Sequence, residues 1–349
     1  MNLLEIGDDP VVRLAATGDM PEAVHAFTPR QVSAVNAALA ARRPLLVRGE
    51  PGIGKSQLAR AAAKRLGRAF VVHTVDARTE SRDLLWHFDA IARLAEAQLI
   101  GATAGLGLGA CGPDAPADPA ARCDLAERQA RERLAVGRFL QPGVLWWAFD
   151  WSGALEQAQR VGIQPPDKPD AGDAALGSVV LIDEIDKAEA DVPNGLLEAL
   201  GAGCFQPQGW SKKVTAVGRA PLVVITTNEE RALPDAFIRR CLVLHLRLPT
   251  DPKRLAELLV GRGRVHFGRK ASARVLERAA ELLIEDRDTA RENHWLPLPG
   301  QAEYLDLVRA VVTSVSKAKE QEALLDKVAE FVLKKHPDAF KQIPEQDQD

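Results

Sequence analysis

Short apolar runs, rich in β-branched residues, recur between residues 44 and 246 of the chain. Each run is bounded by polar or turn-forming residues, which is typical of a strand that is buried on both faces. The runs occupy residues 44–48, 69–75, 178–182, 220–228 and 242–246. Because helical segments lie between them, the pattern predicts an α/β fold.

Helix signals flank the first of these runs. Thr28 is placed to cap a helix that has Pro29 at its first position and ends near Arg42, because a hydroxyl can accept a free backbone N–H at a helix start. An Ala-rich segment predicts a second helix over 57–66, with Gly67 as its stop. A strand, a loop and a helix are therefore expected to follow one another here.

After Pro249 the apolar runs disappear and helical spacing takes over. Asp251 is a good N-cap, and the predicted helices occupy 251–260, 272–285, 301–315 and 316–335. A chain of 349 residues is long enough for two domains. We therefore divide it into an N-terminal extension (1–27), a large α/β domain (28–249), a small all-helical lid (250–336) and a flexible tail (337–349).

Two segments show no periodicity. Residues 101–122 are rich in Gly, Ala and Pro, and this composition predicts a mobile loop inserted in the large domain. No strand precedes its glycines, so Gly105, Gly107 and Gly109 do not indicate a second nucleotide site. Residues 164–177, rich in Pro, Asp and Gly, predict another loop.

Helices are predicted within residues 80–99 and over 124–135, on either side of the first loop. Four aromatic residues follow close together, namely Trp146, Trp147, Phe149 and Trp151. A partner-facing patch would explain them. Core packing of the segment that leads to the next strand explains them more simply, and we favour this interpretation.

A glycine-rich loop links the first strand to the second helix, and it fits the phosphate-binding P-loop. In such loops backbone N–H groups and the helix N-terminus hold phosphate oxygens. Lys55 is expected to reach the β- and γ-phosphates, and Ser56 to ligate Mg²⁺. A glycine-rich turn is the alternative for this motif alone. The predicted nucleotide-binding residues are Gly49, Glu50, Pro51, Gly52, Ile53, Gly54, Lys55, Ser56 and Gln57.

Polar side chains also follow two later strands. Asp183 and Glu184 end the run 178–182, and adjacent carboxylates at a strand end call for a cation beside them. We expect Asp183 to hold Mg²⁺ and Glu184 to polarise the water that attacks the γ-phosphate. If the strand that ends at Asn228 lies between the other two, the Asn228 amide would orient this water. An acidic turn and a turn-forming Asn are the alternatives.

Two adjacent arginines, Arg239 and Arg240, precede the last apolar run. A guanidinium is suited to stabilise charge on a transferring phosphoryl group. One of them, Arg240 in preference, is predicted to act as an arginine finger on the nucleotide of a neighbouring subunit. A solvated basic helix end is the alternative.

These elements, in this order, resemble the AAA+ ATPases, and more closely their MoxR-type branch. The P-loop and the acidic strand end are common to P-loop NTPases, whereas the Asn228 strand and the run 233–241 are typical of AAA+ proteins. The resemblance implies a P-loop NTPase fold, with a parallel sheet sandwiched by helices and a small C-terminal helical lid. It also implies ATP hydrolysis with Mg²⁺ and a homo-oligomeric ring of six subunits. The similar stretches are 27–67, 177–200, 223–249 and 298–311.

The resemblance also bears on two further places. A hairpin is predicted over 205–216 from Pro207 and Gly209. In this branch such a hairpin lines the central channel. Many AAA+ proteins carry a basic residue at the start of the third lid helix, but this chain has Gln301 there. Arg309 lies farther along that helix and is not expected to substitute for the basic residue. Channel contacts would come from Trp210, Lys212 and Lys213, unless they merely form a solvated tip.

Several functions remain open at this stage. The first is remodelling or maturation of a client protein, with a partner that carries a von Willebrand factor A domain, as the resemblance implies. The second is the NTP-driven motor of a nucleic-acid-directed restriction or defence system. A slowly hydrolysing, nucleotide-gated scaffold is a third. We favour the first of these functions. A P-loop holds phosphates rather than a base, so the preference for ATP over GTP comes from the resemblance.

Composition limits the class of protein, its partners and its location. Hydrophobic residues make up 46% and charged residues 27% of the chain, as in soluble globular proteins. With a net charge of −3 no basic surface dominates, so nucleic acid is not the expected partner. No stretch resembles a signal peptide or a membrane span, and a cytoplasmic location is expected. Four separated cysteines predict free thiols and no zinc site: Cys111, Cys123, Cys204 and Cys241.

Overall fold

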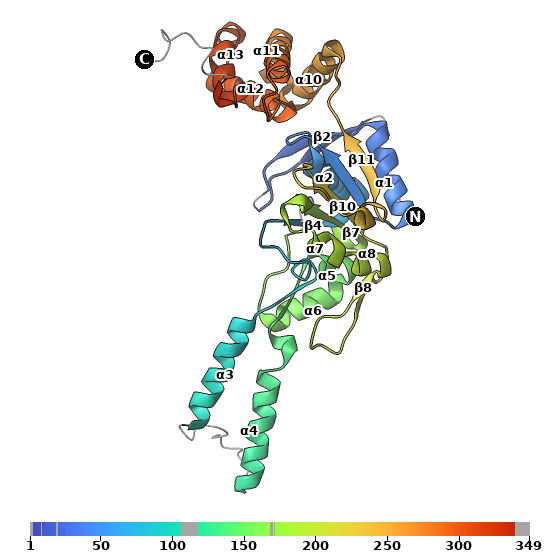
Figure 1. The fold of residues 1–349 in the computed structure, drawn as a ribbon, viewed down its shortest axis with the longest axis vertical. Helices are drawn as coiled ribbons and strands as arrows, with labels where there is room; N and C mark the ends of the chain where they lie inside the picture. The colour runs from blue at the N-terminus through green and yellow to red at the C-terminus, as the bar shows by residue number, and fades with distance from the viewer. Residues whose placement is uncertain are drawn as a thin grey trace.

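The computed structural model describes six parts of the chain: residues 3–7, 9–18, 20–105, 118–167, 170 and 172–338. A central sheet lies between a group of C-terminal helices and a projecting pair of helices (Figure 1). Gly107, Gly109 and Cys111 lie outside the described residues, as does the tail from residue 339 onward.

Five parallel strands form the central sheet. Their order is β11 (Leu242–Leu246), β3 (Leu45–Gly49), β10 (Leu222–Thr227), β7 (Asp173–Asp183) and β4 (Arg68–Thr74). The predicted parallel α/β sheet is therefore confirmed.

The loop predicted over 164–177 is wrong in its last residues, because β7 begins at Asp173. Asp173 pairs with Arg68 across a register shift, after which Ser178 pairs with Ala69. Pairing with the edge strand β4 thus extends β7 through a segment whose glycines suggested a turn.

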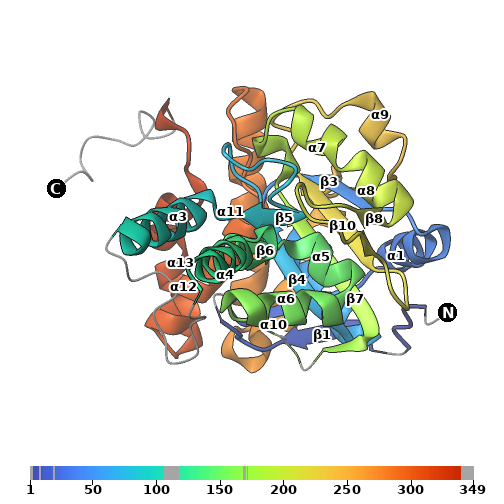
Figure 2. The same cartoon turned by 90° about the horizontal axis from the view of Figure 1, so that it is seen from below.

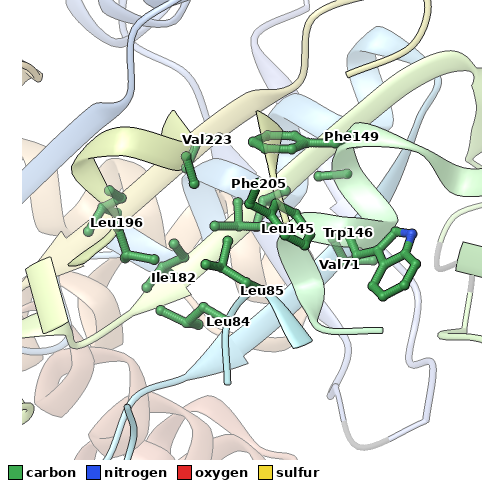
Figure 3. Close-up of a cluster of buried hydrophobic side chains, with 14 of the residues drawn as sticks. Val71, Leu84, Leu85, Leu145, Trp146, Phe149, Ile182, Leu196, Phe205 and Val223 are labelled. Carbon is green, nitrogen blue, oxygen red and sulfur yellow. The ribbon is translucent and has the colours of Figure 1, made fainter. Parts of the chain in front are cut away.

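Side chains of the central strands alternate between two hydrophobic cores, as the strand repeat of two requires. Val180 and Ile182 belong to the first core, and Val179 and Leu181 to the second. The first core, drawn in Figure 3, is covered by α5 (Val144–Phe149), α6 (Trp151–Val161), α7 (Asp191–Gly195) and α8 (Leu197–Ala202). The second is covered by α1 (Pro29–Ala41), α2 (Lys55–Leu66) and a hairpin of β1 (Val11–Leu14) and β2 (Ala23–Ala26).

The aromatic cluster belongs to the first core. Trp146, Trp147 and Phe149 are 1%, 3% and 4% exposed, so the core interpretation is confirmed. The ring centroids of Trp146 and Trp210 lie 5.0 Å apart. Trp210 comes from a small hairpin of β8 (Cys204–Phe205) and β9 (Val214–Thr215), which bears out the hairpin predicted here.

The expected caps begin and end the first helices. Thr28 accepts the backbone N–H of Gln31, and the Gln31 side chain accepts the N–H of Thr28, which completes a capping box. Gly67 ends α2 with a φ of 64°, a left-handed conformation that glycine adopts without a Cβ clash.

The loop predicted over residues 101–122 is wrong at both ends. Helix α3 (Ala90–Gly105) continues through its first residues, and α4 (Pro119–Arg133) begins before its last. Asp118 caps α4 by accepting backbone N–H groups, and Pro119 occupies the first helical position. These local signals and the pairing of the two helices override a composition that is rich in Gly and Pro.

The two helices form a projecting arm, which we call the α3–α4 arm (Figures 1 and 2). Arg133 and Glu96 join the helices through an ion pair of 2.7 Å, and Arg93 donates a hydrogen bond to the carbonyl of Leu134. At the base of the arm β5 (Trp86–Phe88) pairs antiparallel with β6 (Leu140–Pro142).

Four helices form the C-terminal lid, as predicted: α10 (Pro252–Phe267), α11 (Ala273–Glu292), α12 (Gln301–Ser314) and α13 (Ala318–Leu333). Asp251 caps the first helix by accepting the N–H of Arg254. The lid has a hydrophobic core of its own, which includes Leu276, Tyr304 and Leu325. Ile53 of the glycine-rich loop packs against this core, so the lid contacts the large domain at that loop.

The expectations for the cysteines and for membrane-spanning segments can be compared with the structure. Cys123, Cys204 and Cys241 are free thiols, and burial raises the pKa of Cys241 to about 11. Within the described parts of the chain, every helix is too short or too polar to cross a membrane.

A buried histidine links the N-terminal hairpin to the pH dependence of folding. Burial, reinforced by the charge of Arg262, lowers the pKa of His25 to about 3 from 6.5. The unfolded chain therefore binds more protons between these two values, so the free energy of unfolding falls as the pH drops below 6.5. At about pH 5 the loss amounts to about 2 kcal/mol for this one group.

We expect His25→Gln to remove this dependence. Urea unfolding of both proteins at about pH 7.5 and about pH 5 should show a difference between the two pH values that is smaller by about 2 kcal/mol in the variant. Equal pH dependence in the two proteins would contradict the assignment to His25.

Candidate active site

Three adjacent strands bring the predicted residues to one edge of the sheet. β10 lies between β3 and β7, which satisfies the condition on which the expectation for Asn228 depended. The glycine-rich loop follows the end of β3, Asp183 ends β7, and Asn228 directly follows β10. In parallel α/β sheets ligands bind outside these carboxyl ends of the strands.

The glycine-rich loop wraps around the side chain of Lys55. Its ammonium donates to the carbonyls of Gly49 (2.7 Å) and Glu50 (3.0 Å) and to Oδ1 of Asn228 (2.6 Å). Gly54 caps the following helix with a φ of 93°, which a residue with a Cβ would adopt only under strain. The loop therefore depends on glycine for its shape and on Lys55 for its internal contacts.

Burial lowers the pKa of Lys55, while the carboxylates of Asp183, Asp186 and Glu184 act in the opposite direction. Lys55 is only 7% exposed, and the charges of four acidic side chains act on its ammonium. A buried cation that interacts with several carboxylates gives this edge of the sheet charges of both signs.

Ser56 and Asp183 contact each other directly. The Ser56 hydroxyl lies 2.9 and 2.8 Å from the two carboxylate oxygens of Asp183. Thr226 of β10 donates to the same carboxylate and accepts the backbone N–H of Glu184. A hydroxyl and a carboxylate are oxygen donors of the kind that Mg²⁺ prefers, and Mg²⁺ needs only one or two protein ligands when phosphates complete its shell.

This donor set fits Mg²⁺ beside a nucleotide rather than a metal centre made of protein alone. Among the described residues no group of three or more His, Cys, Asp or Glu side chains is arranged to hold a metal ion. Thr226 was missed by the sequence analysis, although a hydroxyl next to the end of a buried strand could have indicated it.

Glu184 stands at the end of β7 in a left-handed conformation, with a φ of 60°. Its carboxylate pairs with Lys187 and accepts a hydrogen bond of 3.2 Å from Nδ2 of Asn228. The hydrogen bond to Glu184 raises the pKa of Lys187. Asn228 thus connects the buried Lys55 on one side to Glu184 on the other.

Asp186 fixes the backbone that carries Asn228. It is 2% exposed and accepts the backbone N–H groups of Asn228 (3.2 Å) and Glu230 (2.9 Å). The sequence analysis assigned it no role, because the acidic run 183–186 shows nothing of its backbone partners in the segment after β10.

The lid closes one side of the site. A cavity of about 370 Å³ is lined by the glycine-rich loop, by Asp183, Glu184 and Asn228, and by one face of α12. Arg309 belongs to that face as well, farther along the helix than Gln301. Residues spaced by three or four share a helix face, and here they are Gln301, Ala302, Leu305, Asp306 and Arg309.

Arg240 does not line this cavity. It follows α9 (Asp235–Ile238), is exposed, and lines a separate cavity of about 450 Å³ with Arg43. Arg43 donates hydrogen bonds to the carbonyls of Arg239 and Arg240, the latter at 2.9 Å. The predicted finger is thus held at its backbone by Arg43 and lies outside the cavity formed by the nucleotide loop of its own chain.

The predicted channel residues fall into two groups. Trp210 is half-buried against Trp146, so its ring is part of the packing of the hairpin. Lys212 and Lys213 are exposed and remain at the surface of the hairpin.

Part of the chain resembles a known protein family. Residues 44–104 match the model of the AAA domain of the dynein-related subfamily. The crystal structure of a candidate ATPase from Cytophaga hutchinsonii aligns at 12% identity with a TM-score of 0.36, and the alignment covers 87% of this chain and 79% of that one. No curated protein gives a significant match. The parallel sheet with its P-loop and helical lid is the fold of a P-loop AAA+ domain.

The Ser56–Asp183 contact predicts how Mg²⁺ affects nucleotide binding. We expect Asp183→Asn to weaken ATP binding about tenfold or more in Mg²⁺, because a neutral amide is a poorer ligand for this cation. In excess chelator the wild type and the variant should bind alike. Calorimetric titration in both buffers checks this, and an equal loss in chelator would show that Asp183 acts on the fold of the loop.

Proposed function

We propose that the protein is an ATP-hydrolysing AAA+ ring enzyme of the MoxR type, which couples hydrolysis to the remodelling or maturation of a client protein. The observation that carries the proposal is the network from Lys55 through Asn228 to Glu184, beside the Ser56–Asp183 contact. A partner with a von Willebrand factor A domain is part of the proposal and rests on the family resemblance.

The side chains divide the chemistry among themselves. Lys55 exchanges contacts with its own loop for the β- and γ-phosphates of ATP, and Ser56 and Asp183 are the residues that would hold Mg²⁺. When bound, this cation neutralises charge on the phosphates. Glu184 accepts a proton from the attacking water, and Asn228, which touches Glu184, orients that water.

Arg240 completes the site from another subunit. Because it lies outside the cavity of its own chain, it can stabilise transferring charge only on the nucleotide of a neighbour. Such a head-to-tail interface closes into a ring when the rotation between subunits permits. The number of six subunits follows from the resemblance.

A client protein is a better candidate for the substrate than nucleic acid. The chain has a net charge of −3, whereas nucleic-acid binding draws on a basic face. The two exposed lysines of the β8–β9 hairpin are a local basic feature that suits contact with a polypeptide in the channel of a ring.

Glu184→Gln should separate binding from hydrolysis. The amide keeps the shape of the side chain but cannot accept the proton, so we expect turnover to fall by a factor of about 10²–10⁴ while ATP affinity is retained. Steady-state ATPase assays and nucleotide titration measure the two quantities. Turnover close to that of the wild type would remove Glu184 from the role of base.

The same variant, held in ATP and Mg²⁺, should trap the client. Affinity capture followed by mass spectrometry and nucleic-acid staining distinguishes the candidate functions. A stoichiometric protein partner, above all one with a von Willebrand factor A domain, is the expected result. Retained DNA or a nuclease subunit would instead favour a motor of a restriction or defence system.

Arg240→Ala should abolish hydrolysis in an assembled ring, and its defect should be rescued in trans. In rings mixed with Glu184→Gln, the intact active site of the Arg240 variant receives a finger from its neighbour, so activity should reappear. Arg239→Ala is the matched control, and mixing curves of ATPase activity are the readout. Loss of activity in Arg239→Ala alone would identify the other arginine as the finger.

A further inference from the structure

A buried ion pair joins the lid to the glycine-rich loop. Arg287 of α11 has a side chain that is 2% exposed, and its Nη2 donates to both carboxylate oxygens of Glu50, at 2.8 and 2.9 Å. Its Nη1 donates at 2.6 Å to the carbonyl of Pro299, in the segment that leads into α12. One guanidinium therefore contacts the second residue of the loop and the start of the helix that lines the cavity.

The position of this pair makes it sensitive to the distance between lid and loop. A guanidinium removed from water is stable only while its partners are in place, because an unpaired buried charge is strongly unfavourable. Displacement of the lid would separate Arg287 from Glu50, whose side chain is 42% exposed and can return to water. The pair thus favours one placement of α11 and α12 against the loop.

Glu50 also contacts the phosphate-binding lysine. Its carbonyl accepts one of the three N–H groups of Lys55, and the other two reach Gly49 and Asn228. An ammonium has three donors, so all of them are engaged within the protein. Lys55 can reach a phosphate only by releasing at least one acceptor, and two of the three lie in the segment that carries Glu50.

Close packing reinforces the connection between loop and lid. A Cβ placed on Gly52 would come within 2.4 Å of the Cβ of Ala302, at the start of α12. The same end of the helix carries the uncharged Gln301, which is 7% exposed. A shift of the loop at Gly52 therefore displaces α12 directly.

We propose that Arg287 is a positioning residue that couples the lid to the phosphate-binding loop through Glu50. When Lys55 turns to the phosphates, the loop around Glu50 shifts, and Arg287 carries that shift into α11 and the start of α12. The inference rests on the proposed ATPase function of this site. It gives the lid a response to nucleotide through a residue that need not touch the nucleotide.

The test compares Glu50→Gln and Arg287→Lys with Arg278→Gln in the full-length protein. Arg278 lies on the same helix, and its ion pairs within the described part of the chain are with Glu281, Glu285 and Asp326 of the lid surface. Amide hydrogen exchange across residues 283–305, with and without ATP and Mg²⁺, measures the response of the lid. Steady-state kinetics then separate kcat from KM.

We expect ATP to change exchange over 283–305 in the wild type and in Arg278→Gln, but not in the two pair variants. In those variants kcat should fall about tenfold, within the range typical of coupling between sites, and ATP affinity should change less than about threefold. A full ATP response in both pair variants would overturn the inference. A wild type that binds no ATP would instead overturn the proposed function.

Either pair variant could fail to fold, since each leaves a buried group with an altered partner. The double variant Glu50→Leu/Arg287→Met replaces the pair by apolar side chains, which restores packing without charge. If it folds and still lacks the lid response to ATP, the pair couples the two parts. If it folds and responds like the wild type, the pair serves stability alone.

Discussion

The order of three strands is the constraint on which the rest of the site depends. Because β10 lies between β3 and β7, the loop after Gly49, the carboxylate of Asp183 and the amide of Asn228 meet at one edge of the sheet. Any other order would place the Asn228 strand outside the pair, and Lys55 would lose an acceptor. The two hydrogen bonds that link Lys55 through Asn228 to Glu184 are a consequence of topology more than of local sequence.

Three buried charged side chains at this edge are held by hydrogen bonds within the chain. Lys55 lies among backbone carbonyls, Asp186 among backbone N–H groups, and Arg287 against Glu50. Such pairs contribute little net stability, because removing both charges from water offsets much of their attraction. They do specify one arrangement of loop, sheet and lid, since each is unfavourable without its partner.

The sequence predicted the features that local patterns encode. The β-branched runs gave the five strands, Thr28 gave a helix start, and Gly67 gave a helix end, because each depends on residues close in the chain. The P-loop motif also located Lys55 and Ser56 at the edge of the sheet. The order of the strands was not predicted, and the place of β10 between β3 and β7 entered only as a condition.

Contacts between distant segments could not be predicted in the same way. Glu50 and Arg287 are 237 residues apart, and nothing near either of them indicates the other. The bond from Asp186 to the backbone of Asn228 and the place of Arg309 on the cavity likewise follow from packing. The boundaries of α3 and β7 were misplaced because tertiary pairing extends both elements through Gly-containing segments.

The α3–α4 arm has a mechanical consequence. At its base β5 and β6 pair with each other through three residue pairs, and α3 runs on for 16 residues beyond that base. At 1.5 Å per residue such a helix is about 24 Å long, so a rotation of about 10° at the base moves its far end by about 4 Å. A small rotation at the base of the arm therefore produces a displacement at its far end that is as large as a side chain.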